Sequence, residues 1–335
     1  MSNKSELIKF LTSARNLINK LPKYNSKYSN KIYDNHQKMI ILVFRQKMRM
    51  TYRGIVKFFR FSGLARALIG LKKVPDHSTL VKFAKRIPVP KLDSLLCKKK
   101  VRIIAVDSSG FETNHMSYHY ANAWNSQDKR RHKNYLKVSI AIDTDNQYIM
   151  AQKVRIGPRN DIIDFKTLIK NLRCDYVVAD KGYCSKANHH FVLRMKAIPM
   201  IARKKNTRVY YEKLGVPLKI DKRIYHQRSK AETVFSVLKR KYSSLILSKN
   251  FESQKREILM RMVAYNIDRK IILSSLVIIG IHQSRFILDL SSNFLFSRIE
   301  SLCLLKSFMR WDTHISIIST LFTQSMKSIS TIFFY

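Results

Sequence analysis

Two aspartates that end short apolar runs constrain the fold of this chain more than any other feature. The runs Val101–Asp107 and Asp175–Asp180 are rich in β-branched residues, which predicts two buried strands. Each is followed at once by a turn containing serine or glycine. A sheet would fix such a carboxylate while the turn exposes it, so both positions suit chemistry. Taken alone, either aspartate could equally cap the turn that follows it.

Strands and helices alternate around these two runs. The pattern predicts further strands at Tyr135–Asp143, Tyr148–Ile156 and Ala197–Arg203, and helices at Asp161–Leu172 and Ser185–Met195. We therefore predict an α/β fold in which a mixed sheet is flanked by helices on its faces.

A third candidate site lies further along the chain, where Tyr225, Arg228, Glu232 and Lys239 follow the spacing Tyr-x2-Arg-x3-Glu-x6-Lys. At roughly 100° per residue, these four side chains share one face of an α-helix. One carboxylate, two cations and a phenol on one face suit a metal ion and a phosphate backbone. The alternative is a solvated charged stripe, which is what most such stripes are.

The charge of the chain points to a polyanionic partner. Lys and Arg number 64 against 22 Asp and Glu, giving a formal net charge of +42. Residues 1–100 hold 24 basic and 4 acidic side chains, whereas residues 101–150 hold 6 and 5. Such an excess is typical of proteins that bind nucleic acid or an anionic membrane, because each neutralised phosphate releases counterions. The balanced central segment keeps the carboxylates that hard divalent cations need.

The N-terminal hundred residues have helical periodicity. Helices are expected at Leu7–Leu21, Asn35–Met48, Thr51–Arg60, Leu64–Leu71 and Asp76–Arg86. In the last of these, Leu80, Phe83 and Ala84 would face inward. The polar side chains that would face outward, and that we expect to contact DNA, are His77, Thr79, Lys82, Lys85 and Arg86. This division fits a helix-turn-helix-like unit; an ordinary helical bundle with a basic surface is the alternative.

Cysteine spacing and hydropathy exclude several classes of protein. The four cysteines form no CxxC pair, so neither a zinc knuckle nor a disulfide framework is indicated. The N-terminus lacks a signal-peptide core, and the apolar stretch Ile271–Ile281 is shorter than the roughly twenty residues that span a bilayer. We predict a soluble cytoplasmic protein, associated with the nucleoid and without a membrane partner.

Together the carboxylates suggest one reaction centre. If the two strand ends and the following helix converge, then Asp107, Asp180 and Glu232 would hold two Mg²⁺ or Mn²⁺ ions for in-line phosphoryl transfer. Arg228 and Lys239 would then hold phosphates, the first by its planar fork and the second as a point charge.

The same residues carry a family resemblance. Asp107, the run Ala179–Tyr183 and the Tyr225/Arg228/Glu232/Lys239 signature resemble the DDE transposases of prokaryotic insertion sequences, most closely the IS-four and IS-five groups. Further similarity is seen at Ser62–Leu64, Pro75–Leu80, Asn160-Asp161 and Tyr265-Asn266.

The resemblance implies an RNase H-like core with a divalent-metal triad at Asp107, Asp180 and Glu232. It also implies cut-and-paste or related transposition of double-stranded DNA, acting on terminal inverted repeats and on target DNA. The family usually works as a dimer in a synaptic complex. We therefore predict a DNA transposase.

Three regions follow from this interpretation. Residues 1–96 would form the helical DNA-binding region, residues 97–272 the RNase H-like catalytic domain, and residues 273–335 an apolar tail. The tail either packs on the core, forms a dimer contact, or is a translated stretch past the ancestral end of the gene. Lys204–Lys222 could form a small basic hairpin near DNA, and Trp124 could stack on a base or fill the core.

Other functions stay open on the sequence alone. The chain could be a DNA-binding relic that no longer cuts, or an RNase H-like structure-specific nuclease or resolvase. A peripheral membrane protein is the weakest candidate, because the basic regions and the apolar tail lie in different parts of the chain.

Overall fold

The computed structural model describes residues 3–29, 31–113, 135–157, 160–202 and 220–296. Residues Met1–Ser274 form one compact unit and Ser275–Tyr335 a second. Trp124, the expected hairpin apart from its last three residues, and the tail beyond residue 296 lie outside the described residues. The expectations for those segments therefore stay predictions, as does the division of the chain at residues 97 and 273.

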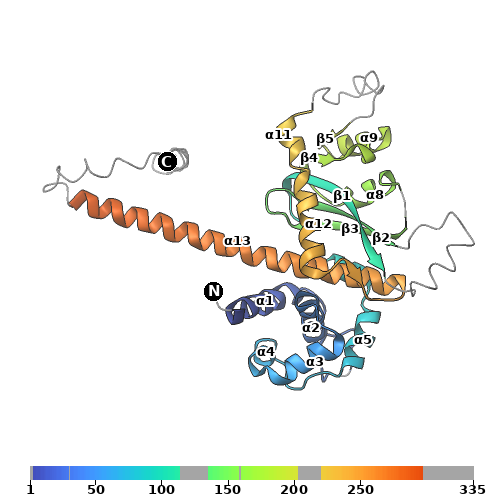
Figure 1. The fold of residues 1–335 in the computed structure, drawn as a ribbon, viewed down its shortest axis with the longest axis vertical. Coiled ribbons are helices and arrows are strands. Elements are labelled where there is room, and N and C mark those ends of the chain that lie inside the picture. Colours follow the sequence, from blue (N-terminus) through green and yellow to red (C-terminus); the bar gives the residue numbers. More distant parts are fainter. Residues whose placement is uncertain (1–2, 30, 114–134, 158–159, 203–219, 297–335) are drawn as a thin grey trace, which may run out of the picture. The chain divides into compact units, whose positions relative to one another are not determined.

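The compact unit contains a mixed six-stranded sheet (Figure 1). Its strands are β1 (Val101–Thr113), β2 (Tyr135–Asp143), β3 (Ile149–Ile156), β4 (Cys174–Ala179), β5 (Ile198–Ile201) and β6 (Leu245–Ile246). The order is β3-β2-β1-β4-β5, with β6 paired to the end of β1. The first three strands are antiparallel, whereas β4 and β5 run parallel to β1. The predicted α/β fold is thus confirmed, and the sheet is consistent with an RNase H-like core.

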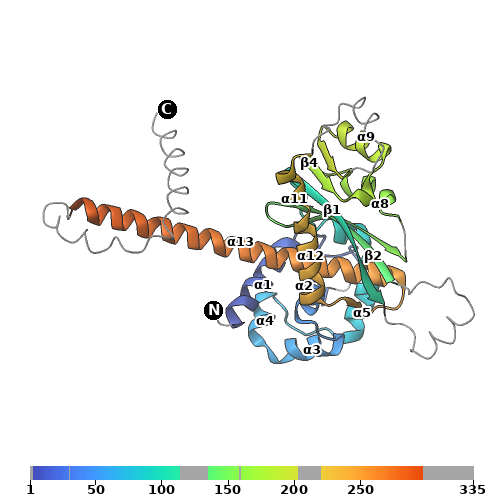
Figure 2. The same cartoon turned by 45° about the horizontal axis from the view of Figure 1, so that its top comes forward.

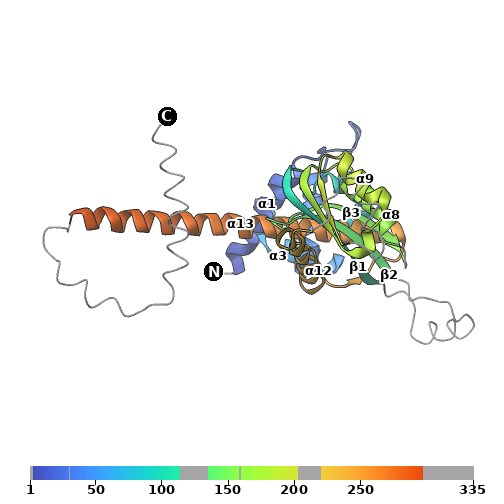
Figure 3. The ribbon, with the colours of Figure 1, turned by 90° about the horizontal axis from the view of Figure 1, so that it is seen from above.

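Side chains alternate along β1 and build a separate core on each face of the sheet. Ile104 and Val106 join the core beneath α8 (Ile162–Ile169) and α9 (Lys186–Arg194). Ile103 and Ala105 join the opposite core, which includes residues from α12 (Ser229–Tyr242) and from the first turns of α13 (Phe251–Phe296). Viewed from above, the sheet separates α8 and α9 from α12 (Figure 3).

The N-terminal helices belong to the second of these cores (Figure 2). They are α1 (Asn3–Ile18), α2 (Asn35–Met48), α3 (Tyr52–Phe61), α4 (Gly63–Leu68), α5 (His77–Arg86) and α6 (Val89–Asp93). Helix starts follow the capping residues in the sequence: Thr51, Ser62 and Asp76 each accept a backbone N–H bond at the start of α3, α4 and α5. The expected helices are therefore present, and they pack on the α12 side of the sheet.

Strand β1 continues past the position where the sequence pattern ends it. We expected the strand to stop at Asp107, but its antiparallel pairing with β2 runs from Ile104 opposite Asp143 to Glu112 opposite Tyr135. Pairing with β4 stops earlier, at Val106 opposite Ala179. Asp107 therefore marks the point where β1 leaves its parallel neighbour, and not the end of the strand.

Helix α13 is anchored to the compact unit by a buried acidic residue. Asp268, 6% exposed, accepts a hydrogen bond from the Tyr242 hydroxyl and pairs with Lys47 at 2.9 Å and Lys241 at 2.7 Å. Lys47 also reaches Glu6, at 2.8 Å. One carboxylate thus joins α2, α12 and α13. No helix in the described part of the chain combines the length and apolarity needed to cross a bilayer.

We expect Asp268→Ala to lower the free energy of unfolding by about 3 kcal/mol, because Lys47 and the Tyr242 hydroxyl lose a buried partner. Glu6 still pairs with Lys47, which places the value at the low end for a broken buried pair. Urea denaturation measures the loss. Asp145→Ala is the control, because Asp145 is 45% exposed and its ion pair to Arg102 is long, 3.7 Å; it should change stability by less than about 0.5 kcal/mol. Equal losses in both variants would contradict the anchoring role.

Candidate active site

Asp107 and Asp180 lie side by side where β1 and β4 part. Each follows directly on the last paired residues of the two strands, Val106 and Ala179. Neighbouring strands are about 4.7–4.9 Å apart. Ala105 and Val178, two residues earlier, pack in the core beneath α12. Because side chains alternate along a strand, both aspartates project toward this same face.

The carboxyl group of Asp107 is held in an unfavourable environment for its charge. Burial raises the pKa of Asp107 to about 6, and the nearby carboxylates of Glu232 and Asp180 act in the same direction. The backbone N–H of Ser108 and the guanidinium of Arg228 oppose this shift. The three carboxylates of the predicted triad therefore interact electrostatically around Asp107.

The four signature residues occupy two helices and not one. Tyr225 belongs to α11 (Lys222–His226), and Arg228 precedes the first residue of α12. Between them, the N–H of Arg228 donates to the Tyr225 carbonyl and the N–H of Ala231 to the Arg228 carbonyl. These three-residue steps are tighter than those of an α-helix. The prediction that all four side chains share one face of a single α-helix is therefore wrong for Tyr225, which lies on the preceding helix.

Arg228 and Glu232 form an ion pair within this site. The guanidinium Nη1 lies 2.7 Å from the Glu232 carboxylate, whose side chain is 54% exposed. Burial opposes the charge on Arg228, but Glu232 and Asp180 outweigh it and raise the pKa of Arg228. Across the described ranges no three His, Cys, Asp or Glu side chains cluster closely enough to hold a metal ion. Glu232 is thus paired with Arg228, while the two aspartates lie together.

Helix α12 is fixed to β1 by apolar contacts beyond the aspartates. Its buried residues are Ala231, Val234, Phe235, Leu238 and Tyr242. The ring of Phe235 lies 6.4 Å from that of Phe111, which the extension of β1 provides. The ammonium of Lys239 lies 5.5 Å from the same Phe111 ring. Glu232 and Lys239 are therefore carried by a helix whose position depends on the extension of β1.

On the opposite face, a polar network supports the same point of the sheet. One oxygen of Asp161 accepts the Ser108 hydroxyl and pairs with Lys137, both at 2.6 Å. The other oxygen lies 3.5 Å from where a side chain on Gly182 would begin. Asp161 thus joins the residue after Asp107 to Lys137 of β2 and borders the turn that follows Asp180. Sequence reasoning missed the roles of Ser108 and Lys137, because the pairs span 53 and 24 positions and follow no periodicity.

A comparison with protein families shows which family the chain belongs to. The family model described as "Transposase DDE domain" matches residues 98–267, which include Asp107, Asp180 and Glu232. The chain belongs to the DDE transposase family. A search of curated proteins found no match. The predicted DDE transposase is thereby confirmed, while the type of insertion sequence stays a prediction.

The predicted DNA-reading residues of the transposase all lie on α5. Leu80 and Ala84 are buried as expected, and Phe83 is half-buried against Lys38. The residues expected to face outward divide into two groups: Lys82, Lys85 and Arg86 are exposed, and His77 and Thr79 are partly exposed. The basic side of α5 therefore faces away from the core; its contact with DNA stays a prediction.

We expect Asp107→Asn to stabilise the metal-free transposase at pH 8. A carboxyl group with a raised native pKa binds its proton more tightly when folded, so stability is lost as pH rises from the unfolded value of 3.8 through about 6. At about 1.4 kcal/mol per pKa unit, the gain from removing the charge is at most about 3 kcal/mol, and it should vanish near pH 4.

Urea denaturation in EDTA at the two pH values measures this difference. Asp175→Asn is the matched control and should show no such gain, because Asp175 lies on β4, the strand that Asp180 follows, but is 51% exposed. A loss of stability in Asp107→Asn at pH 8 would contradict the electrostatic account of the site.

Proposed function

We propose that this transposase cuts and joins DNA at the terminal inverted repeats of an insertion sequence of the IS-four or IS-five type. Asp107, Asp180 and Glu232 are the carboxylates of its phosphoryl-transfer centre. The observation that carries the proposal is the parallel pairing of β1 and β4, which ends immediately before both aspartates. The pairing supports a centre in which two carboxylates face the helix that carries the third.

The residues fit a divalent metal in their chemistry. Carboxylate oxygens are the ligands that Mg²⁺ and Mn²⁺ prefer. Burial, and to a smaller extent its acidic neighbours, raises the pKa of Asp107, so a cation there would stabilise the charged carboxylate. Asp107 and Asp180, with Glu232, would hold the ions. When bound, such ions would supply Lewis-acid chemistry, polarising the scissile phosphate and activating the water or 3′-hydroxyl that attacks it.

The remaining signature residues act on the DNA backbone. Glu232 lies on the surface of α12 and can leave Arg228 by rotation of its own side chain, because it is 54% exposed. The freed guanidinium then offers a planar fork to phosphate oxygens. Lys239 offers a point charge about two turns beyond Glu232 on α12. Tyr225 contributes a contact from α11.

The wider arrangement follows from the same proposal. Residues 1–96 bind transposon ends through α5, residues 97–272 catalyse, and two copies act together in a synaptic complex on double-stranded end and target DNA. The reaction takes place in the cytoplasm, at the nucleoid.

A catalytically silent DNA-binding relic is the second candidate. It is favoured by the Arg228–Glu232 ion pair, which holds the third carboxylate away from a three-carboxylate cluster in the described residues.

Mn²⁺-dependent cleavage of DNA carrying the gene's own flanking ends separates the two. We expect wild type to cut at the ends and Glu232→Gln to lose at least about 100-fold in rate, since the amide cannot replace the charged ligand. Glu252→Gln is the matched control, because Glu252 is also 54% exposed and paired to a basic residue on its own helix; it should cut normally. End binding without cutting by wild type would favour the relic, and cutting by Glu232→Gln would remove Glu232 from the centre.

A further inference from the structure

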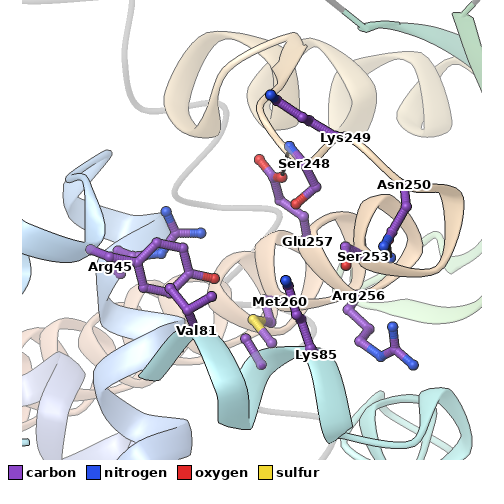
Figure 4. A pocket seen from close by; sticks show the side chains of 12 residues that line it. Arg45, Val81, Lys85, Ser248, Lys249, Asn250, Ser253, Arg256, Glu257 and Met260 are labelled. Carbon is purple, nitrogen blue, oxygen red and sulfur yellow. Dashed lines mark hydrogen bonds between the residues drawn. The ribbon is translucent and has the colours of Figure 1, made fainter. Parts of the chain in front are cut away.

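Helix α5 is bordered by a cleft along each flank. The first has a volume of about 240 Å³, and its lining includes four residues of α5: Thr79, Lys82, Phe83 and Arg86. The second, of about 260 Å³, takes Val81, Ala84 and Lys85 from it (Figure 4). At roughly 100° per residue these two sets lie on opposite sides of the helix.

The first cleft concentrates positive charge, with Asp34 close to Lys38 but outside the lining. Lys38 and Lys91, from α2 and α6, face Lys82 and Arg86 of α5 across it, and none of its lining residues is a carboxylate. The ammonium of Lys38 lies 4.5 Å from the Phe83 ring, and burial lowers the pKa of this lysine. Four cations around one cleft repel one another, so an anion there would be stabilised.

The second cleft is also positive, because its one carboxylate is already engaged. Glu257 accepts the backbone N–H groups of Leu247 and Ser248 and pairs with Arg261 at 2.5 Å. Lys85 on α5 and Lys249, from the segment before α13, are exposed and both line the cleft (Figure 4).

A buried arginine in the wall of this second cleft adds to its positive charge. Arg45 is only 7% exposed and stacks at 4.2 Å from the Tyr52 ring. Its Nε has no hydrogen-bond partner in the described part of the chain. Its Nη1 donates to the carbonyl of Met50 at 3.3 Å, so the guanidinium is satisfied only in part, and an anion in the cleft would offer a further acceptor.

We propose that α5 lies in the major groove of duplex DNA and that the two clefts receive phosphates of the backbones on either side. The inference rests on the proposed function and extends it to Lys38 and Lys91 on one flank and Lys249 on the other. A helix of about 10–12 Å diameter fills a groove about 12 Å wide, so phosphates border it on both sides. An ordinary solvated basic face has no need of cation-lined hollows on both flanks.

The second cleft lies between two parts of the chain that are far apart in sequence. Lys249 belongs to the segment that joins β6 to α13, whereas Lys85 belongs to the N-terminal helices. A phosphate held between them connects the DNA-reading helix with the helix that packs on the catalytic sheet.

The salt dependence of binding to a fluorescent duplex tests the proposal. Each phosphate contact contributes about 0.9 to the slope of log affinity against log salt concentration. We expect Lys91→Gln and Lys249→Gln each to reduce the magnitude of this negative slope by about 1, and the double variant to reduce it by about 2. The loss should be equal on end sequences and unrelated duplexes, because phosphate contacts carry no sequence information.

Lys166→Gln is the matched control, since Lys166 is an exposed lysine on α8, across the sheet from α5. Its slope should equal that of wild type. Suppose that the wild type still cleaves the ends. Unchanged slopes in both test variants, or a change on one flank only, would then overturn the two-cleft arrangement but not the proposed function. Failure of the wild type to bind any duplex would instead overturn the proposed function itself.

Discussion

The parallel pairing of β1 with β4 is the constraint on which the site depends. Because side chains alternate along a strand, a slip of one residue in β4 would turn Asp180 to the face covered by α8 and α9. Apolar residues of both strands are buried on both faces, which fixes the register. Asp161 reinforces the same point from behind by bonding Ser108 and Lys137. The position of the two aspartates therefore depends on strands that are buried on both faces.

Helix α13 makes the catalytic sheet and the N-terminal helices one unit. Asn266 bonds both the backbone N–H and the carbonyl of Ile149, at 2.9 and 2.8 Å, as a neighbouring strand would. Tyr265 donates to the carbonyl of Gln147 in the preceding turn. The Tyr265-Asn266 pair, noted in the sequence only for its family resemblance, thus has a structural role in fastening α13 to the β2–β3 turn. Asp268, one helical turn or less further on, extends the same attachment to α2 and α12.

Helices and strands that depend on local residue patterns were predicted correctly from the sequence. The β-branched run before Asp107, the strand Tyr135–Asp143 and the helix Asn35–Met48 all follow their residue patterns. The extension of β1 does not, because its backbone partners come from β2 and leave no mark on the serines and glycine after Asp107.

Contacts between distant parts of the chain leave no pattern in the sequence from which they could be predicted. The pairing of Lys137 with Asp161 spans 24 positions of the chain. The tight turn that separates Tyr225 from α12 is closed by local backbone hydrogen bonds, which the spacing of the signature residues does not indicate. The clefts beside α5 need side chains from α2, α6 and the segment before α13, which only the folded chain brings together. Sequence reasoning therefore found the carboxylates and the basic helix, but not what surrounds them.

The central claim is that Asp107, Asp180 and Glu232 form one metal-dependent centre, and anomalous diffraction from crystals soaked in Mn²⁺ tests it most directly. The account predicts Mn²⁺ bound by the carboxylates of Asp107 and Asp180, with Glu232 released from Arg228 to join them. Crystals in which Mn²⁺ binds elsewhere, or in which the aspartates stay metal-free while Glu232 remains paired with Arg228, would contradict it.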